Sequence, residues 1–355
     1  MTNSTILSSC IALLESLIAI PSFSREEGQT ASLIASFLAA AGLEGVNRHG
    51  NNIWVRHPHW REGRPVLLLN SHHDTVKPAA GWVRDPFVPS WEGDSLYGLG
   101  SNDAGGALVS LIAAFLLLKD RQDLPYNLLL TATAEEEISG AGGIASLLPL
   151  LGKVDAGIVG EPTALEVAVA DRGLVVIDGE AVGVSGHAAR EEGVNALYVA
   201  LDDIARLRDF RFEKESALLG PVKVSVTQIQ AGKQHNVVPD VCSFVVDVRV
   251  NEHYTNAEVV DALQAVCQSR LTARSLRLQS SGIAQDHPLA KAAIGAGLRC
   301  YGSPTLSDQA LMPFPTIKLG PGDSARSHTA DEYIRRSEIV AGVETYLKVL
   351  GMCDI

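Results

Sequence analysis

The chain has little cysteine, few aromatic residues and no surplus of positive charge. Its 355 residues include five cysteines, 5% aromatic residues and a formal net charge of −12. The cysteines are scattered and form no CxxC pair, so we interpret them as reduced thiols that pack as small apolar side chains. The negative charge argues against nucleic acid or an anionic membrane as the main partner, because both require a basic face.

Long hydrophobic runs are also scarce. No run approaches the roughly 18 apolar residues that a membrane span requires. The apolar stretch Ile11–Ile20 contains Glu15, follows no Lys or Arg and ends at Pro21, which fits an amphipathic helix better than a signal peptide. We therefore expect a cytoplasmic protein with no membrane partner, and the chain length favours two domains.

Helical and strand-like segments alternate in the first part of the chain. Helices are predicted over residues 6–20, 26–43, 104–119 and 142–148, and strands over 52–56, 66–69, 127–133 and 156–159. This alternation predicts an α/β fold whose mixed, mainly parallel sheet is flanked by helices.

The pattern changes near Arg172. Strands are predicted over residues 174–184, 222–230, 241–249 and 275–279, and helices over 194–207 and 256–270. The order β-α-β-β-α-β is the ferredoxin-like arrangement, the split βαβ unit. We therefore predict one unit from residues 1–171 and 282–355, interrupted by a small inserted domain over 172–281.

Histidines and acids follow four apolar runs, all of them outside the predicted insert. The four sites are His72 after residues 66–71, Glu135–Glu137 after 128–134, Glu161 after 156–160 and His328 beyond 315–320. Ligands of open α/β sheets gather beyond the carboxyl ends of the strands. Alone, each site has a structural explanation, such as a solvated helix start for three glutamates. Their joint occurrence predicts a single metal site.

Two divalent ions would use four of these side chains together with Asp103. The candidate ligands are His72, Asp103, Glu137, Glu161 and His328. Zinc takes about four to five ligands, and two ions about 3.5–4 Å apart share a bridging group. Asp103 is the natural bridge, because surrounding glycines let the backbone approach the ions. Asp74 could orient His72, and Glu136 would be the general base for a metal-activated water. Glu135 and His73 are left without a role.

Five ordered segments carry a resemblance to the M20 metallopeptidase family. They are residues 71–76 (SHHDTV), 98–106 (GLGSNDAGG), 136–140 (EEISG), 160–163 (GEPT) and 328–332 (HTADE). The similarity covers essentially the whole chain, including the insert. Two departures stand out. Leu99 and Ala104-Gly105 replace an Arg and a Met-Lys pair found in many members, and Ser71 replaces a glycine.

The resemblance implies two zinc ions, although cobalt or manganese would suit the same ligands. His72 and Glu161 would hold one ion and Glu137 and His328 the other, with Asp103 between them. The insert would be a dimerisation or lid domain, giving a homodimer. Its His187 would stabilise the oxyanion in the partner's site, and Asn236 and Arg249 would bind the substrate carboxylate.

The expected substrate is an N-acyl-L-amino acid. Residues 303–308 and 320–328 look most like the acetylornithine/acetyl-lysine deacetylase branch. The resemblance therefore implies deacetylation of N-acetylornithine, or of N-acetylcitrulline, in arginine biosynthesis. Arg326, close to His328, could fork onto the substrate carboxylate. Asp308 or Asp323 could bind a cationic side chain, although both also suit turns. Arg249 could equally be a strand-edge ion pair.

Other functions stay open at this point. An N-acetyl-lysine or N-succinyl-amino acid deacylase would need the same site. A dizinc dipeptidase or aminopeptidase would need a site for a free α-amine instead of an acyl group. A non-catalytic binding protein could keep the fold, but the complete set of ligands and Glu136 argue against it.

Overall fold

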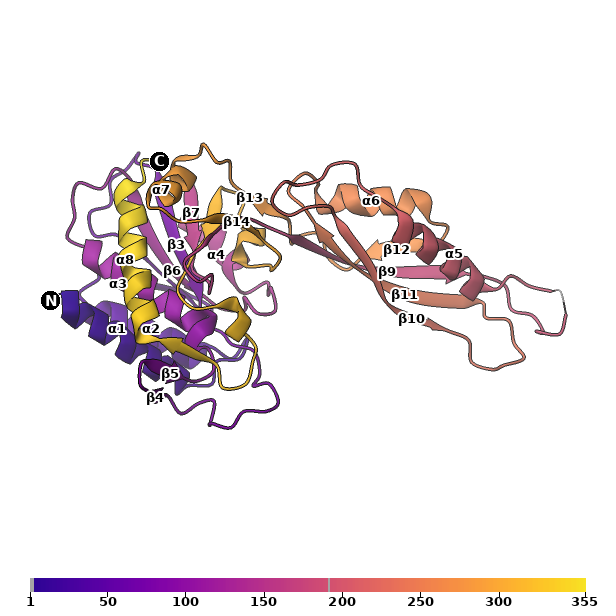
Figure 1. Ribbon diagram of the computed structural model, residues 1–355, viewed down its shortest axis with the longest axis horizontal. Helices are drawn as coiled ribbons and strands as arrows, with labels where there is room; N and C mark the ends of the chain where they lie inside the picture. The colour runs from indigo at the N-terminus through magenta and orange to yellow at the C-terminus, as the bar shows by residue number, and fades with distance from the viewer. Residues whose placement is uncertain (1–2, 191) are drawn as a thin grey trace. The chain divides into compact units, whose positions relative to one another are not determined.

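The computed structural model describes residues 3–190 and 192–355, and the chain divides into two compact units. The first comprises residues 1–169, 282–301 and 307–355, and the second comprises 170–281 and 302–306. The predicted boundaries differ from these by two residues at the first junction, and residues 302–306 join the second unit. Figure 1 shows the elements of both units, each of which is described by itself.

A nine-stranded sheet runs through the first unit. Its path is β1 (Asn47–His49), β2 (Asn52–Arg56), β6 (Asn127–Thr133), β3 (Val66–His72), β7 (Ala156–Val159), β15 (Thr316–Lys318), β8 (Val167–Asp171) and β13 (Ser281–Gly282), with β14 (Cys300–Ser303) beside β8. The four central strands are parallel, and β2 and β8 flank them antiparallel. The predicted fold class is confirmed.

The central strands are buried along their whole length and rich in apolar residues, because both faces of the sheet are covered. Leu67 and Leu69 of β3 belong to one hydrophobic cluster, whereas Leu68 between them belongs to another. The first cluster includes residues of α1 (Asn3–Ile18), α2 (Gly28–Ala40), α3 (Gly106–Leu118), α7 (Pro288–Gly295) and α8 (Arg336–Met352). On the other face lies α4 (Ile144–Leu151). Burial on both sides makes the strand ends the places where polar side chains can gather.

One helical stretch, Ser101–Leu118, is long and apolar enough to cross a membrane by length and composition. This corrects the expectation that no run approaches that length. Of its residues, 89% are buried inside the structure, where α3 packs against α1 and α8. Within this stretch, α3 is the central helix of the unit, and residues 101–105 before it leave the helical conformation at Asp103 and Ala104.

Three short strands form a second, antiparallel sheet in the same unit. They are β16 (Tyr333–Arg335), β5 (Ser95–Tyr97) and β4 (Ser90–Glu92). Because β16 pairs with β5, the segment that follows His328 is held beside the segment that leads to Asp103.

The second unit has the predicted β-α-β-β-α-β order. Its elements are β9 (Gly173–Val182), α5 (Ala196–Asp209), β10 (Lys223–Ala231), β11 (Val241–Val250), α6 (Asn256–Val266) and β12 (Arg270–Ala273). The antiparallel sheet has the order β10-β11-β9-β12.

The last strand of this unit was predicted at the wrong place. It lies at Arg270–Ala273 and not at 275–279, because α6 ends at Val266. The amide of Gln264 donates to the carbonyls of Cys267 and Ser269, which turns the chain there. Leu271 then enters the core of the unit. Both stretches alternate in sequence, and only the length of the helix decides which one pairs with β9.

Candidate metal centre

Parallel pairing brings three of the predicted sites to the same edge of the sheet. His72 ends β3 and is level with Thr133 at the end of β6, and β7 lies on the other side of β3. The loop after β6 carries Glu136 and Glu137, and Glu161 comes two residues after β7. Residues remote in sequence therefore meet because parallel strands end together.

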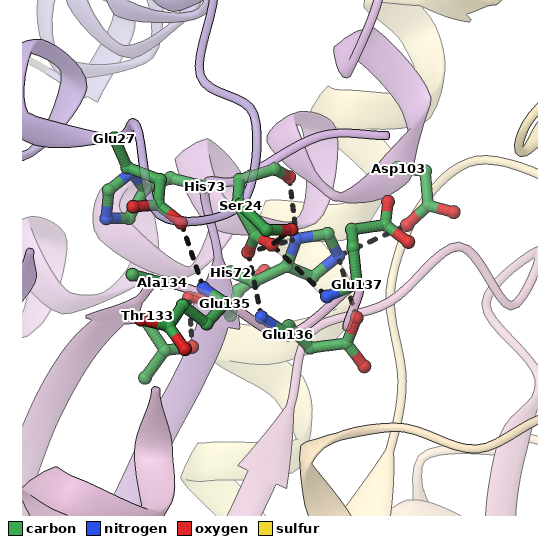
Figure 2. Close-up of polar contacts among 12 residues, drawn as sticks. Ser24, Glu27, His72, His73, Asp103, Thr133, Ala134, Glu135, Glu136 and Glu137 are labelled. Carbon is green, nitrogen blue, oxygen red and sulfur yellow. Dashed lines mark hydrogen bonds and ion pairs between the residues drawn. The ribbon is translucent and has the colours of Figure 1, made fainter. Parts of the chain in front are cut away.

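Asp103 lies between the two histidines, with a different oxygen toward each. Its Oδ1 is 3.3 Å from Nε2 of His72, and its Oδ2 is 3.7 Å from Nε2 of His328. Figure 2 shows Asp103 facing the imidazole of His72. This is the arrangement that a carboxylate bridging two cations would need.

Further carboxylates complete the cluster. Oε2 of Glu137 is 2.9 Å from Nε2 of His328. Oε1 of Glu161 is 3.8 Å from Nε2 of His72, and Oε2 of Glu136 is 3.9 Å from the same nitrogen. Two groups have ligand atoms within 4.8 Å of one another, namely His72-Asp103-Glu137 and His72-Glu136-Glu161. Distance alone does not separate Glu136 from Glu161 as a ligand.

The electrostatics of the cluster suit divalent cations. Burial raises the pKa of Glu161 to about 8 and the pKa of Glu136 well above its usual value. The hydrogen bond that Nε2–H of His328 donates to the Glu137 carboxylate raises the pKa of His328 to about 9. Four largely buried carboxylates thus lie around two imidazoles; they are those of Asp103, Glu136, Glu137 and Glu161, around His72 and His328. This excess of negative charge must bind either protons or cations. Imidazole and carboxylate together form a donor set for zinc, cobalt or manganese.

Asp74 contacts both His72 and the loop of Glu136. Nδ1 of His72 lies 3.0 Å from the backbone carbonyl oxygen of Asp74 and 3.4 Å from its Oδ1. The same carboxylate accepts the backbone N–H groups of Glu136 and Glu137 and the hydroxyl of Ser24. Burial opposes ionisation, but the hydrogen bond with His72 lowers the pKa of Asp74. A buried carboxylate therefore faces Nδ1, leaving Nε2 toward Asp103.

Glu332 was missed as a site residue. Its carboxylate is buried and accepts the backbone N–H groups of Gly100, Asn102 and Asp103 at 3.1, 2.8 and 2.9 Å. Burial and nearby Asp103 raise the pKa of Glu332 to about 8. In the sequence, Glu332 was visible only as an acid in the same segment as His328. The loop of Asp103 that it binds lies more than two hundred residues earlier, so the sequence did not indicate their contact.

The structure gives a physical reason for glycine at 105 and for Ser71, two of the residues that depart from the family pattern; nothing in it explains Leu99. A Cβ on Gly105 would lie 2.3 Å from the carbonyl oxygen of Gly100, and one on Gly106 would lie 2.0 Å from Cδ1 of Ile334. Ser71 is fully buried and donates to the carbonyl oxygen of Gly160 at 2.8 Å. The serine thus ties the end of β3 to the residue before Glu161.

The two arginines expected to bind substrate have partners within the chain. Arg326 donates from both terminal nitrogens to the carboxylate of Glu338 at 2.8 Å and lies over the ring of Tyr333. Arg249 forms a two-point ion pair with Asp247 at 2.8 and 3.1 Å. Arg326 therefore has a structural role that the sequence did not suggest, and Arg249 makes the ion pair that was the alternative interpretation.

The acids considered for a cationic side chain are also engaged. Asp308 is buried, and its Oδ2 accepts from Asn70 and Thr133 at 2.8 Å each. Asp323 caps a short turn by accepting from the N–H of Ala325. The hydrogen bonds of Asp323 are those of a turn residue.

His187 and Asn236 are neighbours in the second unit, and both are exposed. His187 forms a β-bridge with Val237, and the N–H of Ala188 donates to the carbonyl oxygen of Asn236. This bridge prolongs the pairing of β9 with β11 beyond Val182 and Val241. Arg249 lies at the other end of β11.

Comparison with known proteins identifies relatives along most of the chain. Residues 68–351 match the family described as Peptidase family M20/M25/M40. An acetylornithine deacetylase of Salmonella arizonae is 30% identical over 91% of this chain and 92% of its own length. A succinyl-diaminopimelate desuccinylase of Rhizorhabdus wittichii is 28% identical over 76% of this chain and 75% of its own.

Solved structures share the fold at lower identity. Aminopeptidase PepT from Bacillus cereus superimposes with a TM-score of 0.76 at 19% identity, covering 97% of this chain and 98% of its own. The YXEP protein of Bacillus subtilis, described as a dinuclear metal binding peptidase, has a TM-score of 0.74 at 18% identity, with 98% of both chains covered.

Proposed function

The chain belongs to peptidase family M20/M25/M40 and is a metal-dependent amidohydrolase, and from this premise we propose that it removes the acyl group from an N-acyl-L-amino acid. N-acetylornithine is the first candidate, as a step of arginine biosynthesis in the cytoplasm. The likeness to acetylornithine deacetylases, at 30% and 31% identity, together with the resemblance of residues 303–308 and 320–328, supports this choice. The desuccinylase relatives make an N-succinyl-amino acid the second candidate.

Two divalent ions, zinc first, would be held by the five clustered side chains. His72 and Glu161 would bind one ion, Glu137 and His328 the other, and Asp103 both. The separate approach of the two Asp103 oxygens to the two imidazoles supports this division. When bound, the ions supply positive charge that polarises the substrate carbonyl and lowers the pKa of water.

Glu136 would act as the general base. Its side chain is 12% exposed, and burial holds its pKa well above the usual value, which suits a group that must both take and return a proton. Glu136 takes a proton from water as the water oxygen bonds to the carbonyl carbon. It then gives this proton to the amide nitrogen as the C–N bond breaks, and the carboxylic acid so formed releases its remaining proton to the amine, which leaves a carboxylate and an ammonium group.

One assay tests both the reaction and the base. The wild-type protein, loaded with zinc, is expected to hydrolyse N-acetylornithine, N-acetylcitrulline or N-succinylornithine in preference to dipeptides. Glu136→Gln should lower kcat by at least about 10²-fold while the metal content stays near wild type. Turnover of dipeptides alone would replace the deacylase by a peptidase, and unchanged activity of Glu136→Gln would refute the base.

We propose that the protein is a homodimer and that residues of the second unit complete the substrate site of the other copy. Arg249 lies eight residues along β11 from Val241, about 27 Å for an extended strand, and Asn236 lies beyond Val241 in the same direction. Both residues cannot contact one small substrate from the same copy. If both residues bind the carboxylate of one substrate, they come from different copies, and His187 comes from the same copy as its neighbour Asn236.

Exposed apolar side chains indicate where the copies would meet. Tyr198 and Leu201 of α5 are 65% and 48% exposed, and Ile229 of the edge strand β10 is 44% exposed. Edge strands with free N–H and C=O groups pair readily with another chain. Leu201→Glu should shift the dimer toward monomer in light scattering, whereas Leu150→Glu, which changes an exposed leucine of α4, should not. A monomeric wild-type protein would contradict the proposal.

A further inference from the structure

Four consecutive backbone N–H groups after β6 each donate to a buried side chain. The pairs are Ala134 to Oδ1 of Asn52 at 3.0 Å, Glu135 to Oε1 of Glu27 at 3.1 Å, Glu136 to Oδ1 of Asp74 at 3.0 Å and Glu137 to Oδ2 of Asp74 at 3.2 Å. Figure 2 shows the backbone N–H of Glu135 pointing toward the carboxylate of Glu27. The segment is neither strand nor helix, so no regular ladder supplies acceptors for these amides.

Two of the three acceptors come from outside the region matched to the family. Glu27 immediately precedes α2, and Asn52 is the first residue of β2, whereas the family match begins at residue 68. Both side chains are fully buried. The early part of the chain therefore contributes directly to the loop that carries the proposed base.

Both side chains are themselves fixed by further hydrogen bonds. Glu27 also accepts the N–H of Arg25 at 2.6 Å and the amide of Asn51 at 2.8 Å. Asn52 donates to the carbonyl oxygen of Gly142 at 2.6 Å, so it holds both ends of the 134–142 loop. A buried acceptor with several partners cannot follow a displaced loop without losing the others.

The two residues that had no role belong to the same network. Oε2 of Glu135 accepts the N–H of Gly142 at 3.1 Å, which closes the loop from inside. His73 lies 2.9 Å from Oγ1 of Thr30 through Nδ1 and 2.9 Å from the carbonyl oxygen of Asn51 through Nε2. It thus links α2 to the turn that presents Asn51 to Glu27.

We infer that Glu27 and Asn52 are positioning residues for Glu136, an inference that rests on the proposed deacylase function. They hold the N–H groups of the two residues directly before the base, and Asp74 holds those of the base and of Glu137. Displacement of a reacting group by about 1 Å can cost about 10² in rate. Removing either acceptor should therefore lower kcat more than it changes substrate binding or metal content.

The decisive variants are Glu27→Met, which removes the acceptor, and Glu27→Gln, which keeps one oxygen for Glu135. Glu26→Met is the matched control, because Glu26 is the exposed neighbour. Glu27→Met should lower kcat by about 10- to 100-fold with KM within about threefold, whereas Glu27→Gln should recover most of the rate. Asn52→Leu, with Asn47→Leu on the exposed strand β1 as control, repeats the test if Glu27→Met does not fold.

Hydrogen exchange provides a readout that needs no substrate. In the wild-type protein the amides of 134–137 should be protected, and Glu27→Met should speed their exchange by about tenfold or more. Unprotected wild-type amides would overturn the inference. So would a kcat within about twofold of wild type in a variant whose Tm falls, because that is a purely structural role.

Two further outcomes separate this inference from its premise. Loss of metal together with kcat in Glu27→Met would overturn the assignment to Glu136 and transfer it to the ligand Glu137. If the wild-type protein hydrolyses no N-acyl amino acid, the proposed function fails. Hydrogen exchange in the two variants would still show whether Glu27 and Asn52 hold the loop.

Discussion

Replacing Glu332 by glutamine tests whether a single buried carboxylate holds Asp103 in place. Its Oε1 accepts the N–H groups of Asn102 and Asp103, and its Oε2 accepts the N–H of Gly100. The side chain is 2% exposed, so no water can substitute. Glutamine has nearly the same shape but only one acceptor oxygen, so Glu332→Gln changes the hydrogen bonding with little change in packing.

The expected cost follows from the three hydrogen bonds. The amide oxygen can keep Asn102 and Asp103, and the NH2 group then faces the N–H of Gly100. One buried donor without an acceptor costs about 1–3 kcal/mol. Burial and nearby Asp103 raise the pKa of Glu332 to about 8, so above that pH the variant also lacks a negative charge close to Asp103, and this offsets part of the cost. A net loss of about 1–2 kcal/mol corresponds to roughly 2–8 °C in Tm for a unit of this size.

Calorimetry and metal analysis on the same samples provide the assay. Glu332→Gln should lower Tm by this amount and reduce the occupancy of the two metal ions that Asp103 would bind. Glu344→Gln, an exposed carboxylate on α8, is the control and should change neither quantity. An unchanged Tm with two ions per chain would refute the assignment of Glu332 as the support of the Asp103 loop.

Two other predictions concern charge. Glu161 and Glu332 have folded pKa values of about 8, above the ordinary 4.5, and His328 about 9, above 6.5, so the metal-free folded state binds protons that the unfolded state releases. The stability that these protons supply is present at low pH and is lost as pH rises through these pKa values. The Tm of chelator-treated protein should therefore fall between about pH 5 and about pH 9, while the difference in Tm between metal-loaded and chelator-treated protein widens. A constant difference in Tm would contradict this prediction. Arg326→Met should lower the free energy of unfolding by about 1–3 kcal/mol and leave KM unchanged, because Arg326 and Glu338 bind each other and are only 15% and 24% exposed. A raised KM at unchanged Tm would instead indicate that Arg326 binds the substrate.

The sequence alone was sufficient for the sheet and for the edge where the site lies. Apolar runs such as 66–69 and 127–133 are long enough to mark strands that are buried on both faces, and His72, Glu137 and Glu161 stand at or just after such strands. Periodicity and burial are local properties, so they can be read from neighbouring residues. Alternation with helices then implies parallel strands, whose ends must coincide.

The sequence was insufficient where two patterns competed or where a partner lay far away. Residues 270–273 and 275–279 both alternate, and the end of α6 chose between them. Arg326 was expected at the substrate because it stands two residues before His328, yet its guanidinium binds Glu338 on α8, twelve residues further along the chain. Side-chain pairing depends on where helices end and pack, which short windows do not contain.

The chain's own order of residues thus determined the fold class, the family resemblance and the set of acids and histidines around one sheet edge. Tertiary structure decided how those groups face one another: one oxygen of Asp103 toward each imidazole, and Glu332 beneath the Asp103 loop. It also decided that Glu27 and Asn52 hold the loop of Glu136. The physical reason is that every buried polar group must find a partner, and packing brings that partner from any distance along the chain.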